Sequence, residues 1–518
     1  MKFFRSRPPL WAPIVVLGLV AAIGPPTEAQ TPTPSLVDPD LAVRTAASGL
    51  AQPVNLAFLG RNDMLVLEKA SGRVQRVVNG VLHSTVLDLA VNSASERGLL
   101  GIALHPRFKK NGLVYLFWTD TISGADSALL EDVPLLGNRV DRFIWNGSSL
   151  TFDQNLIKLR AFQADDAQPL RGNHNGGVMA FGLGEGGRDD HGRDSHGRGH
   201  DADRRRDGRA KLYIQVGDTG RRGQMQNLED GPFGPGVPDD QFGGPEPDDA
   251  HFTGVILRLN DDGSAPKDNP FFEHGAEVGG EVGANIQKIF AYGIRNGFGI
   301  AFDPVSGDLW EQENGDDSFS ELNRVEPGMN SGWVQIMGPV TRIHEFKAIE
   351  TDPTAPQPFA ANGYFGLQQI RWPPTNIADS PEEALERLFM LPGAHYSPPE
   401  ISWKFEVAPG GIAFVEGRGL GSKYENDLIM GAARPFLEGG HLFHFELTGN
   451  RRRMRVSDRR LRDGVADNNH KFDITESESL LFGRNFGTVV DIKTGPNGNL
   501  YAVSIDHGNI YEIHRRRR

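Results

Sequence analysis

The 518-residue sequence contains no cysteine, which excludes disulfide bonds and thiolate metal sites. Basic residues are not in excess, and the formal net charge of −13 argues against broad nucleic-acid binding, which needs a basic face. Long helical periodicity is also missing. Beyond the N-terminus, no apolar run reaches the roughly 20 residues that a transmembrane helix needs. The 63 glycines and 34 prolines, spread along the chain, instead indicate many short strands joined by turns.

A short unit recurs six times at irregular spacing. Each copy has an apolar turn entry followed by two strand-like runs, and the clearest copy comprises residues 301–304, 308–310 and 321–325. The other turn entries begin at Ala57, Ala103, Ala180, Ala413 and Thr494. The first runs are residues 64–67, 113–116, 212–215, 309–310, 428–430 and 500–503. The second runs are residues 72–77, 140–145, 255–259, 322–325, 442–447 and 509–513.

These repeats predict the fold class. A unit that cannot bury its own faces must stack on its neighbours, and six such sheets around an axis form a propeller. We therefore expect an all-β, six-bladed β-propeller with long loop insertions over residues 41–515. That architecture places a ligand site at one end of a central channel.

The N-terminus predicts the compartment. Three basic residues precede an apolar stretch at residues 11–24, and small residues follow at Thr27 and Ala29. This pattern predicts a secretory signal peptide over residues 1–29 and a periplasmic or secreted protein, with no transmembrane segment after the signal peptide. An uncleaved N-terminal anchor is the alternative. Residues 30–40, rich in proline and threonine, are expected to be a flexible mature N-terminus.

Two insertions interrupt the later repeats. Residues 184–210 contain glycine, aspartate, arginine and three histidines, with almost no apolar side chain, and are predicted to be disordered. Weak metal binding by these histidines is the alternative. Residues 338–399 form a long loop insertion whose aromatic residues indicate that part of it packs. Within it, residues 380–391 could form a helix.

Four motifs have residue types suited to chemistry. His174 lies in an Asn-His-Asn-Gly-Gly turn and can act as a general base. Asp218 ends the next strand, where a carboxylate can orient an imidazole. Arg295 and Asn296 offer donors to an anionic or carbonyl-rich ligand. The fourth motif is an acidic turn over residues 313–317, whose carboxylates and freed carbonyls suit Ca²⁺. Taken singly, such motifs also occur as structural features: a hydrogen-bonded histidine, a Gly-Asp that ends a strand, or an acidic turn.

In their order along the chain, the motifs resemble the glucose/sorbosone dehydrogenase family of soluble quinoprotein aldose dehydrogenases. The resemblance extends from residue 49 to residue 513, outside the insertions. It includes residues 96–106, 173–174, 217–218, 293–296, 321–323, 332–333, 408–411 and 495–498. That family is a six-bladed propeller, which agrees with the repeat count.

The resemblance implies a site and a reaction. Family members hold pyrroloquinoline quinone and Ca²⁺, and hydride passes from a sugar to the quinone, which needs an external electron acceptor. By position, His174 is the base and Asp218 orients it. The residues implied in cofactor binding are Glu96, Arg295, Asn296 and Arg434, and Arg295 also belongs to the catalytic set. The residues implied in calcium binding are Gly315 and Asp316.

The sequence departs from the family pattern at the implied cofactor site. Glu96 replaces a usual glutamine, Ser331 replaces a tyrosine, and Thr488 and Val490 stand where two arginines are usual. Losing two charge-assisted hydrogen bonds weakens cofactor binding by roughly 1.5–3 kcal/mol each. The leading hypothesis is a quinone-dependent sugar dehydrogenase with a rearranged cofactor pocket. A non-redox propeller that binds carbohydrate or a protein partner is the alternative, and a calcium-assisted hydrolase or lactonase is a weaker one.

Overall fold

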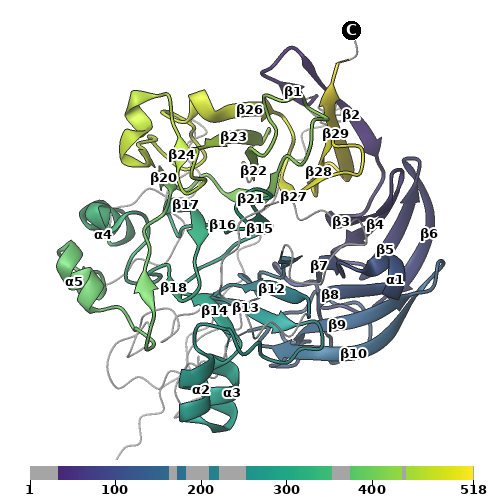
Figure 1. The fold of residues 1–518 in the computed structure, drawn as a ribbon, viewed down its shortest axis with the longest axis horizontal. Coiled ribbons are helices and arrows are strands. Elements are labelled where there is room, and N and C mark those ends of the chain that lie inside the picture. The colour runs from purple at the N-terminus through teal and green to yellow at the C-terminus, as the bar shows by residue number, and fades with distance from the viewer. Residues whose placement is uncertain are drawn as a thin grey trace, which may run out of the picture.

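The computed structural model describes residues 33–162, 172–182, 209–220, 252–352, 374–434 and 439–516. Within these ranges the chain forms six β-sheets set around a common centre (Figure 1). The all-β class and the propeller arrangement predicted from the repeats are confirmed. The predicted signal peptide and nearly all of the 184–210 insertion lie outside the described residues. No helix in the described part of the chain is long and apolar enough to cross a membrane.

The first three sheets follow one another along the chain, and their strands are given from the centre outward. The first sheet comprises β3 (Pro53–Gly60), β4 (Asp63–Glu68), β5 (Arg73–Val78) and β6 (Val81–Asp88). The second comprises β7 (Leu99–Leu104), β8 (Leu113–Thr119), β9 (Asn138–Trp145) and β10 (Leu150–Leu159). The third comprises β11 (Met179–Phe181), β12 (Lys211–Val216), β13 (Val255–Asn260), β14 (Ile289–Tyr292), β18 (Met329–Asn330) and β19 (His395–Tyr396).

The other three sheets complete the circle. The fourth comprises β15 (Gly299–Phe302), β16 (Leu309–Glu313), β17 (Ser318–Val325), β20 (Ile401–Phe405) and β25 (Val465–Ala466). The fifth comprises β21 (Pro409–Phe414), β22 (Leu428–Ala432), β23 (His441–Leu447), β26 (Leu481–Arg484) and β1 (Ser35–Leu36), with β24 (Met454–Arg455) beside β23. The sixth comprises β27 (Val489–Thr494), β28 (Leu500–Ser504), β29 (Asn509–Arg515) and β2 (Leu41–Ala47).

The repeat seen in the sequence corresponds to the inner three strands of each sheet. The predicted first and second runs overlap the second and third strands, such as β4 and β5 in the first sheet. The apolar turn entries are the ends of the innermost strands: Ala57 lies in β3 and Ala301 in β15. The outer strands carry no repeated motif. In β6 and β10 many side chains are exposed to solvent, which relaxes the demand for apolar residues.

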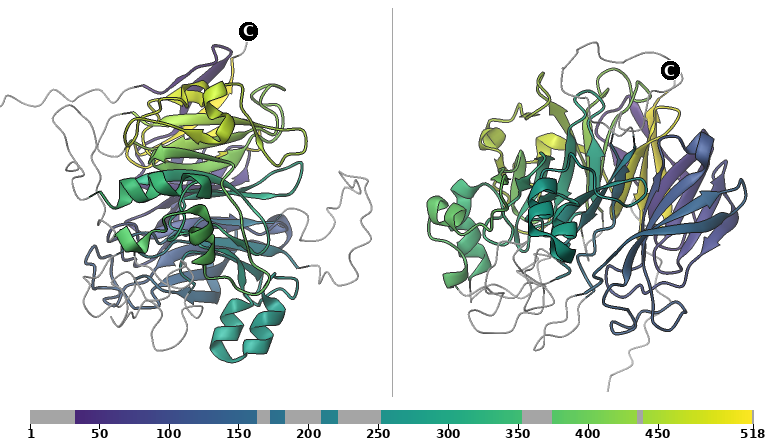
Figure 2. Two further views of the ribbon diagram at one scale, coloured as in Figure 1. Left: turned by 90° about the vertical axis from the view of Figure 1, so that its left-hand side faces the viewer. Right: turned by 60° about the horizontal axis from the view of Figure 1, so that its bottom comes forward.

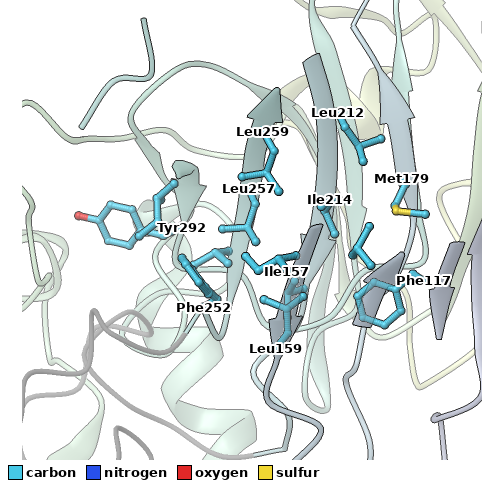
Figure 3. Packing of buried hydrophobic residues seen from close by; sticks show 14 of the residues in the cluster. Phe117, Ile157, Leu159, Met179, Leu212, Ile214, Phe252, Leu257, Leu259 and Tyr292 are labelled. Atoms are coloured by element: carbon cyan, nitrogen blue, oxygen red, sulfur yellow. The ribbon is translucent and has the colours of Figure 1, made fainter. Parts of the chain in front are cut away.

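The core is divided among the interfaces between neighbouring sheets. The innermost strands β3, β7, β11, β15, β21 and β27 contact one another in a closed ring. Figure 3 shows one interface, in which Phe117 and Leu159 of the second sheet pack against Leu212 and Leu257 of the third. Comparable clusters fill the other five interfaces between sheets. Because each sheet buries both faces against its neighbours, the fold depends on closing the ring.

Ring closure joins the two ends of the described chain. Strand β2 pairs antiparallel with β29, with Leu41 opposite Arg515 and Val43 opposite Ile513. Through this pairing, the N-terminal strand β2 becomes the outer strand of the sixth sheet. The ring therefore has fewer unpaired strand edges. Strand β1, within the stretch expected to be flexible, pairs with β26.

The helices are short and lie at the periphery. They are α1 (Phe108–Asn111), α2 (Phe272–Val278), α3 (Gly280–Ile286), α4 (Ile343–Glu350) and α5 (Pro381–Glu386). Helices α2 and α3 project together from the third sheet (Figures 1 and 2). Helix α5 falls inside the predicted helix 380–391, and Ser380 caps it by accepting a hydrogen bond from the Glu383 amide. Within the 338–399 insertion, α4 and α5 pack on Phe319 and Trp333 in a separate apolar cluster.

Candidate functional site

Sheet topology brings the predicted site residues to one end of the propeller. Each innermost strand begins, and each second strand ends, at the same end of the ring, because neighbouring strands are antiparallel. The loops that lead into innermost strands contain Glu96, His174, Arg295 and Asn296. The loops that follow second strands contain Asp218, Gly315, Asp316 and Arg434. We refer to this end of the ring as the site rim.

His174 and Asp218 are in direct contact. His174 Nδ1 lies 2.6 Å from Asp218 Oδ1, and both side chains are buried. The backbone of His174 has a φ of 58°, a left-handed conformation that is uncommon outside glycine. Gly176 follows at φ 65°, and a Cβ there would meet the Gln215 carbonyl oxygen at 2.4 Å, so the turn requires glycine. His174 Nε2 makes no hydrogen bond within the described residues.

Asp218 is held through both carboxylate oxygens. Gly220 donates its amide to Oδ1 over 2.8 Å, and Trp333 donates its indole N–H to Oδ2 over 3.0 Å. Burial by itself raises the pKa of Asp218, but the pairing with His174 and the charge of Arg295 outweigh it, so this pKa lies below its ordinary value. An ionised Asp218 favours the proton on His174 Nδ1, which leaves Nε2 as an acceptor.

Glu96, which precedes the second sheet, contacts the His174 turn that precedes the third. Its Oε2 accepts the His174 amide over 2.7 Å and the Asn296 side-chain amide over 3.3 Å. Lys69, which follows β4, lies close enough to respond to this charge: burial lowers the pKa of Lys69, and Glu96 counteracts that decrease. Asn296 Oδ1 is buried and has no hydrogen-bond partner among the described residues. That oxygen is suited to a ligand donor.

Arg295 occupies the oxygens predicted to bind calcium. Its Nη1 donates to Gly315 O over 2.7 Å and to Asn314 O over 3.1 Å, and its Nη2 lies 2.7 Å from Asp316 Oδ1. The guanidinium also lies over the Trp333 ring, with Cζ 5.4 Å from the centroid. The described residues contain no cluster of three or more histidine, aspartate or glutamate side chains suited to a metal. As placed, therefore, these oxygens do not fit calcium while Arg295 holds them.

Three glutamates of β16 and β17 are buried beneath this site, and Glu311 was not singled out in the sequence. Glu313 accepts the Arg295 amide, and Asn323 donates to both Glu311 and Glu321 over 2.8 and 2.9 Å. Burial raises the pKa of each of the three carboxyls above its ordinary value, and their mutual charge reinforces the shift at Glu311 and Glu313. The available sequence signal was a Glu-Gln-Glu run inside a strand, where charged residues are unusual.

Two further residues missed by sequence reasoning support the acidic turn. Glu350, the last residue of α4, accepts the backbone amides of Asp317 and Ser318 over 2.9 and 3.0 Å. Lys471 lies 2.9 Å from Asp317 and 2.6 Å from Glu406, and it is 1 % exposed. Both residues are remote in sequence from the turn, so no local pattern could have revealed them.

The remaining predicted cofactor contact, Arg434, lies on the fifth sheet, and Thr488 lies beside β27 of the sixth. Arg434 follows β22 close to His441, whose pKa is lowered to about 4 by burial and by the charges of Arg434 and Arg484. Thr488, which stands where the family pattern usually has an arginine, donates its amide to Asp506 over 2.9 Å. This part of the site rim is therefore basic on the fifth sheet and acidic on the sixth.

The family assignment follows from a match over the first part of the chain. Residues 50–360 match the protein family described as Glucose / Sorbosone dehydrogenase, which is more than half of the sequence. The chain belongs to this family. Its members are sugar dehydrogenases, so the resemblance inferred from the motifs is confirmed at the level of the family.

Named relatives of this glucose/sorbosone dehydrogenase chain are distant. An uncharacterized protein of Synechocystis sp. is 28% identical over 315 residues, covering 57% of this chain and 59% of that protein. Quinoprotein glucose dehydrogenase B of Acinetobacter calcoaceticus is 27% identical over 296 residues, covering 56% and 52%. The chain thus spans between half and three-fifths of the length of these curated relatives.

Solved structures share the fold of this family member. The PQQ-bound aldose sugar dehydrogenase from Streptomyces coelicolor superposes with a TM-score of 0.52 at 20% identity, covering 92% of this chain and 98% of that one. At this identity the likeness supports the propeller arrangement alone.

Proposed function

We propose that this protein oxidises the C1 hydroxyl of an aldose sugar to the lactone, with pyrroloquinoline quinone as the cofactor. The observation that carries the proposal is the His174–Asp218 pair, with a 2.6 Å contact at Nδ1 and an Nε2 that has no partner in the described residues. The family membership and the names of the quinoprotein relatives support the reaction class.

His174 is the proposed general base. Because Asp218 is ionised and occupies Nδ1, His174 Nε2 accepts the proton of the C1 hydroxyl as that carbon is oxidised. The carboxylate then stabilises the imidazolium that forms. The glycine turn and the Glu96 contact to the His174 amide fix the backbone from which the imidazole projects.

The cofactor contacts that we propose are Arg295, Asn296, Glu96 and Arg434. When bound, the quinone supplies the acceptor for the hydride that leaves C1. The unpartnered Asn296 Oδ1 fits a donor of such a cofactor. The Arg295 guanidinium would donate to its carbonyl oxygens on leaving Asp316, to which it now donates. Glu96, Thr488 and Val490 supply no positive charge to a polycarboxylate, so we expect moderate affinity.

Calcium at Gly315 and Asp316 stays a prediction. Binding there requires Arg295 to give up its contacts with these two oxygens and turn toward the cofactor. The acidic turn over residues 313–317 would then be neutralised by Arg295 in the calcium-free state and by the ion in the calcium-bound state. No step of the proposed proton transfer depends on the metal.

The proposal also covers the propeller around the site, the electron acceptor and the location of the protein. We expect each of the six sheets to act as one blade of a six-bladed propeller around the site. The oxidation releases two electrons, so an external electron acceptor completes it. A periplasmic or secreted location fits the predicted signal peptide.

The direct test is dye-linked aldose oxidation by the purified protein with quinone and Ca²⁺ added, beside His174→Ala. We expect activity that depends on the quinone and falls roughly 10²–10⁴-fold in the variant, the range that a positioned base contributes. The proposal is wrong if a panel of aldoses gives no turnover and calorimetry detects no quinone binding.

The alternative function is a propeller that binds carbohydrate or a protein partner without redox chemistry. It is favoured by one observation: the Thr488 amide donates to Asp506 over 2.9 Å, which places a carboxylate where the family pattern usually has cofactor-binding arginines. Saccharide binding by calorimetry without quinone binding would support this alternative.

A further inference from the structure

Trp333 lies between two residues of the proposed active site. It follows Gly332, whose φ is 111°, and its amide donates to Gly293 O over 3.0 Å. The side chain is 2 % exposed and packs with Phe319 and Phe346 in the cluster that α4 and α5 complete. The indole is therefore fixed from the side of the 338–399 insertion and presents its N–H toward the site.

The Trp333 indole contacts both Asp218 and Arg295. Its Nε1 donates to Asp218 Oδ2 over 3.0 Å, while Asp218 Oδ1 faces His174 Nδ1 at 2.6 Å. The Arg295 guanidinium lies over the same ring, 5.4 Å from the centroid. The Trp333 side chain thus fixes the plane of the Asp218 carboxylate, which orients His174. It also packs against the Arg295 guanidinium.

We infer that Trp333 is a positioning residue for the proposed base: through its bond to Asp218 Oδ2, it holds the carboxylate in the plane that orients His174. The inference rests on the proposed function for its kinetic readout. The terminal torsion of a carboxylate is broad, and a fixed donor on the second oxygen, in addition to the donors on the first, restricts that rotation. The effect belongs to the N–H group, since an aromatic ring without it could still pack against Arg295.

The charges around the pair determine the expected pH effect. His174 faces Asp218 at its ring and Glu96 at its amide, and Asp218 also faces the Gly220 amide and Arg295. Removing the indole N–H takes a donor from the Asp218 carboxylate, which then stabilises the imidazolium of His174 more strongly. The acid limb of the kcat/KM profile is therefore expected to move to higher pH.

The experiment compares Trp333→Phe with Trp403→Phe. Trp403 is a matched control because it is fully buried in β20 and its indole N–H has no hydrogen-bond partner among the described residues. For Trp333→Phe we expect kcat to fall roughly tenfold, with KM changing much less, and the acid limb to shift; a positioned base contributes 10²–10⁴-fold. Trp403→Phe should leave kcat and the pH profile unchanged.

A second readout separates this inference from the proposed reaction. The imidazole nitrogens of His174, observed by ¹⁵N NMR and assigned with His174→Gln, should shift and titrate differently in Trp333→Phe but not in Trp403→Phe. If Trp333→Phe fails to fold, a benzothiophene analogue at position 333 keeps the ring and replaces the N–H by sulfur. An unchanged His174 titration and unchanged kcat would overturn the inference, whereas a shifted titration in a protein that oxidises no sugar would count against the proposed reaction alone.

Discussion

At the scale of single residues, the site is organised around close side-chain pairs. His174 pairs with Asp218 and Arg295 with Asp316, both within 2.7 Å. Glu96 accepts the amide N–H groups of His174 and Asn296, and Lys69 is a cation close to it. Glu96 thus places a carboxylate at the site rim, where a polycarboxylate quinone would bind in the proposed reaction.

Glu96→Gln is expected to tighten quinone binding about tenfold. Removing a like charge at the site rim relieves about 1–2 kcal/mol of repulsion in a partly buried setting. The new amide oxygen can still accept the His174 N–H. Isothermal calorimetry with the quinone measures the effect without any assay of turnover.

Glu446→Gln is the matched control for this measurement. Glu446 lies in β23 toward the opposite end of the ring and pairs with Arg455, with both side chains exposed. Equal affinity in the Glu96 variant and the wild type would show that the quinone does not bind near residue 96.

At the scale of elements, β16 and β17 combine strand formation with an unusual polar interior. Glu311 and Glu313 alternate with Gln312 along β16, and all three side chains are fully buried. Burial keeps the glutamates protonated to higher pH than usual, as their raised pKa values indicate. These strands therefore depend on neutral carboxyl groups beneath the loop that holds Arg295.

The stability of the fold should consequently fall as pH rises. A carboxyl whose folded pKa is raised contributes its full stabilisation below its unfolded value, near 4.5, and loses it as pH rises through the folded pKa. The loss is about 1.4 kcal/mol for each pH unit between the two values. Thermal unfolding of the wild type should therefore shift downward between about pH 5 and pH 8.

Glu313→Gln tests this dependence. A glutamine at this position can still accept hydrogen bonds from the Arg295 amide and the Ser331 hydroxyl, and it has no carboxyl group to titrate. We expect a flatter dependence of the melting temperature on pH than in the wild type. A slope as steep as that of the wild type would mean that Glu313 is not a source of the pH dependence.

At the scale of the whole molecule, the propeller is closed by strands from opposite ends of the chain. Strand β2 supplies the outer edge of the sixth sheet by pairing with β29. Leu41 and Ala47 of β2 are buried, and Leu41 belongs to the core cluster between the fifth and sixth sheets. Loss of β2 would expose an edge of β29 as well as this core.

Deleting the chain through Ala47 should destabilise the protein strongly. Each buried large apolar residue that is lost removes about 1.5–3 kcal/mol, and the freed edge promotes association. We expect a lower melting temperature and aggregation in light scattering. A chain that begins at residue 33 keeps β2 and serves as the control; equal stability of the two chains would rule out β2 as the closing strand.

Local residue patterns were enough to predict the inner strands of each sheet and the propeller arrangement, and they singled out His174 and Asp218. Alternating apolar runs specify strands through their own periodicity, and a histidine or aspartate in a glycine turn is visible within a few residues. The contacts that complete the site depend on the closed ring. Trp333 reaches Asp218 across 115 residues, and Asn296 reaches Glu96 across 200. Such pairings arise only when segments far apart in the sequence meet at one rim, so tertiary structure alone decided that Arg295 holds Gly315 and Asp316 and that the strand glutamates are buried.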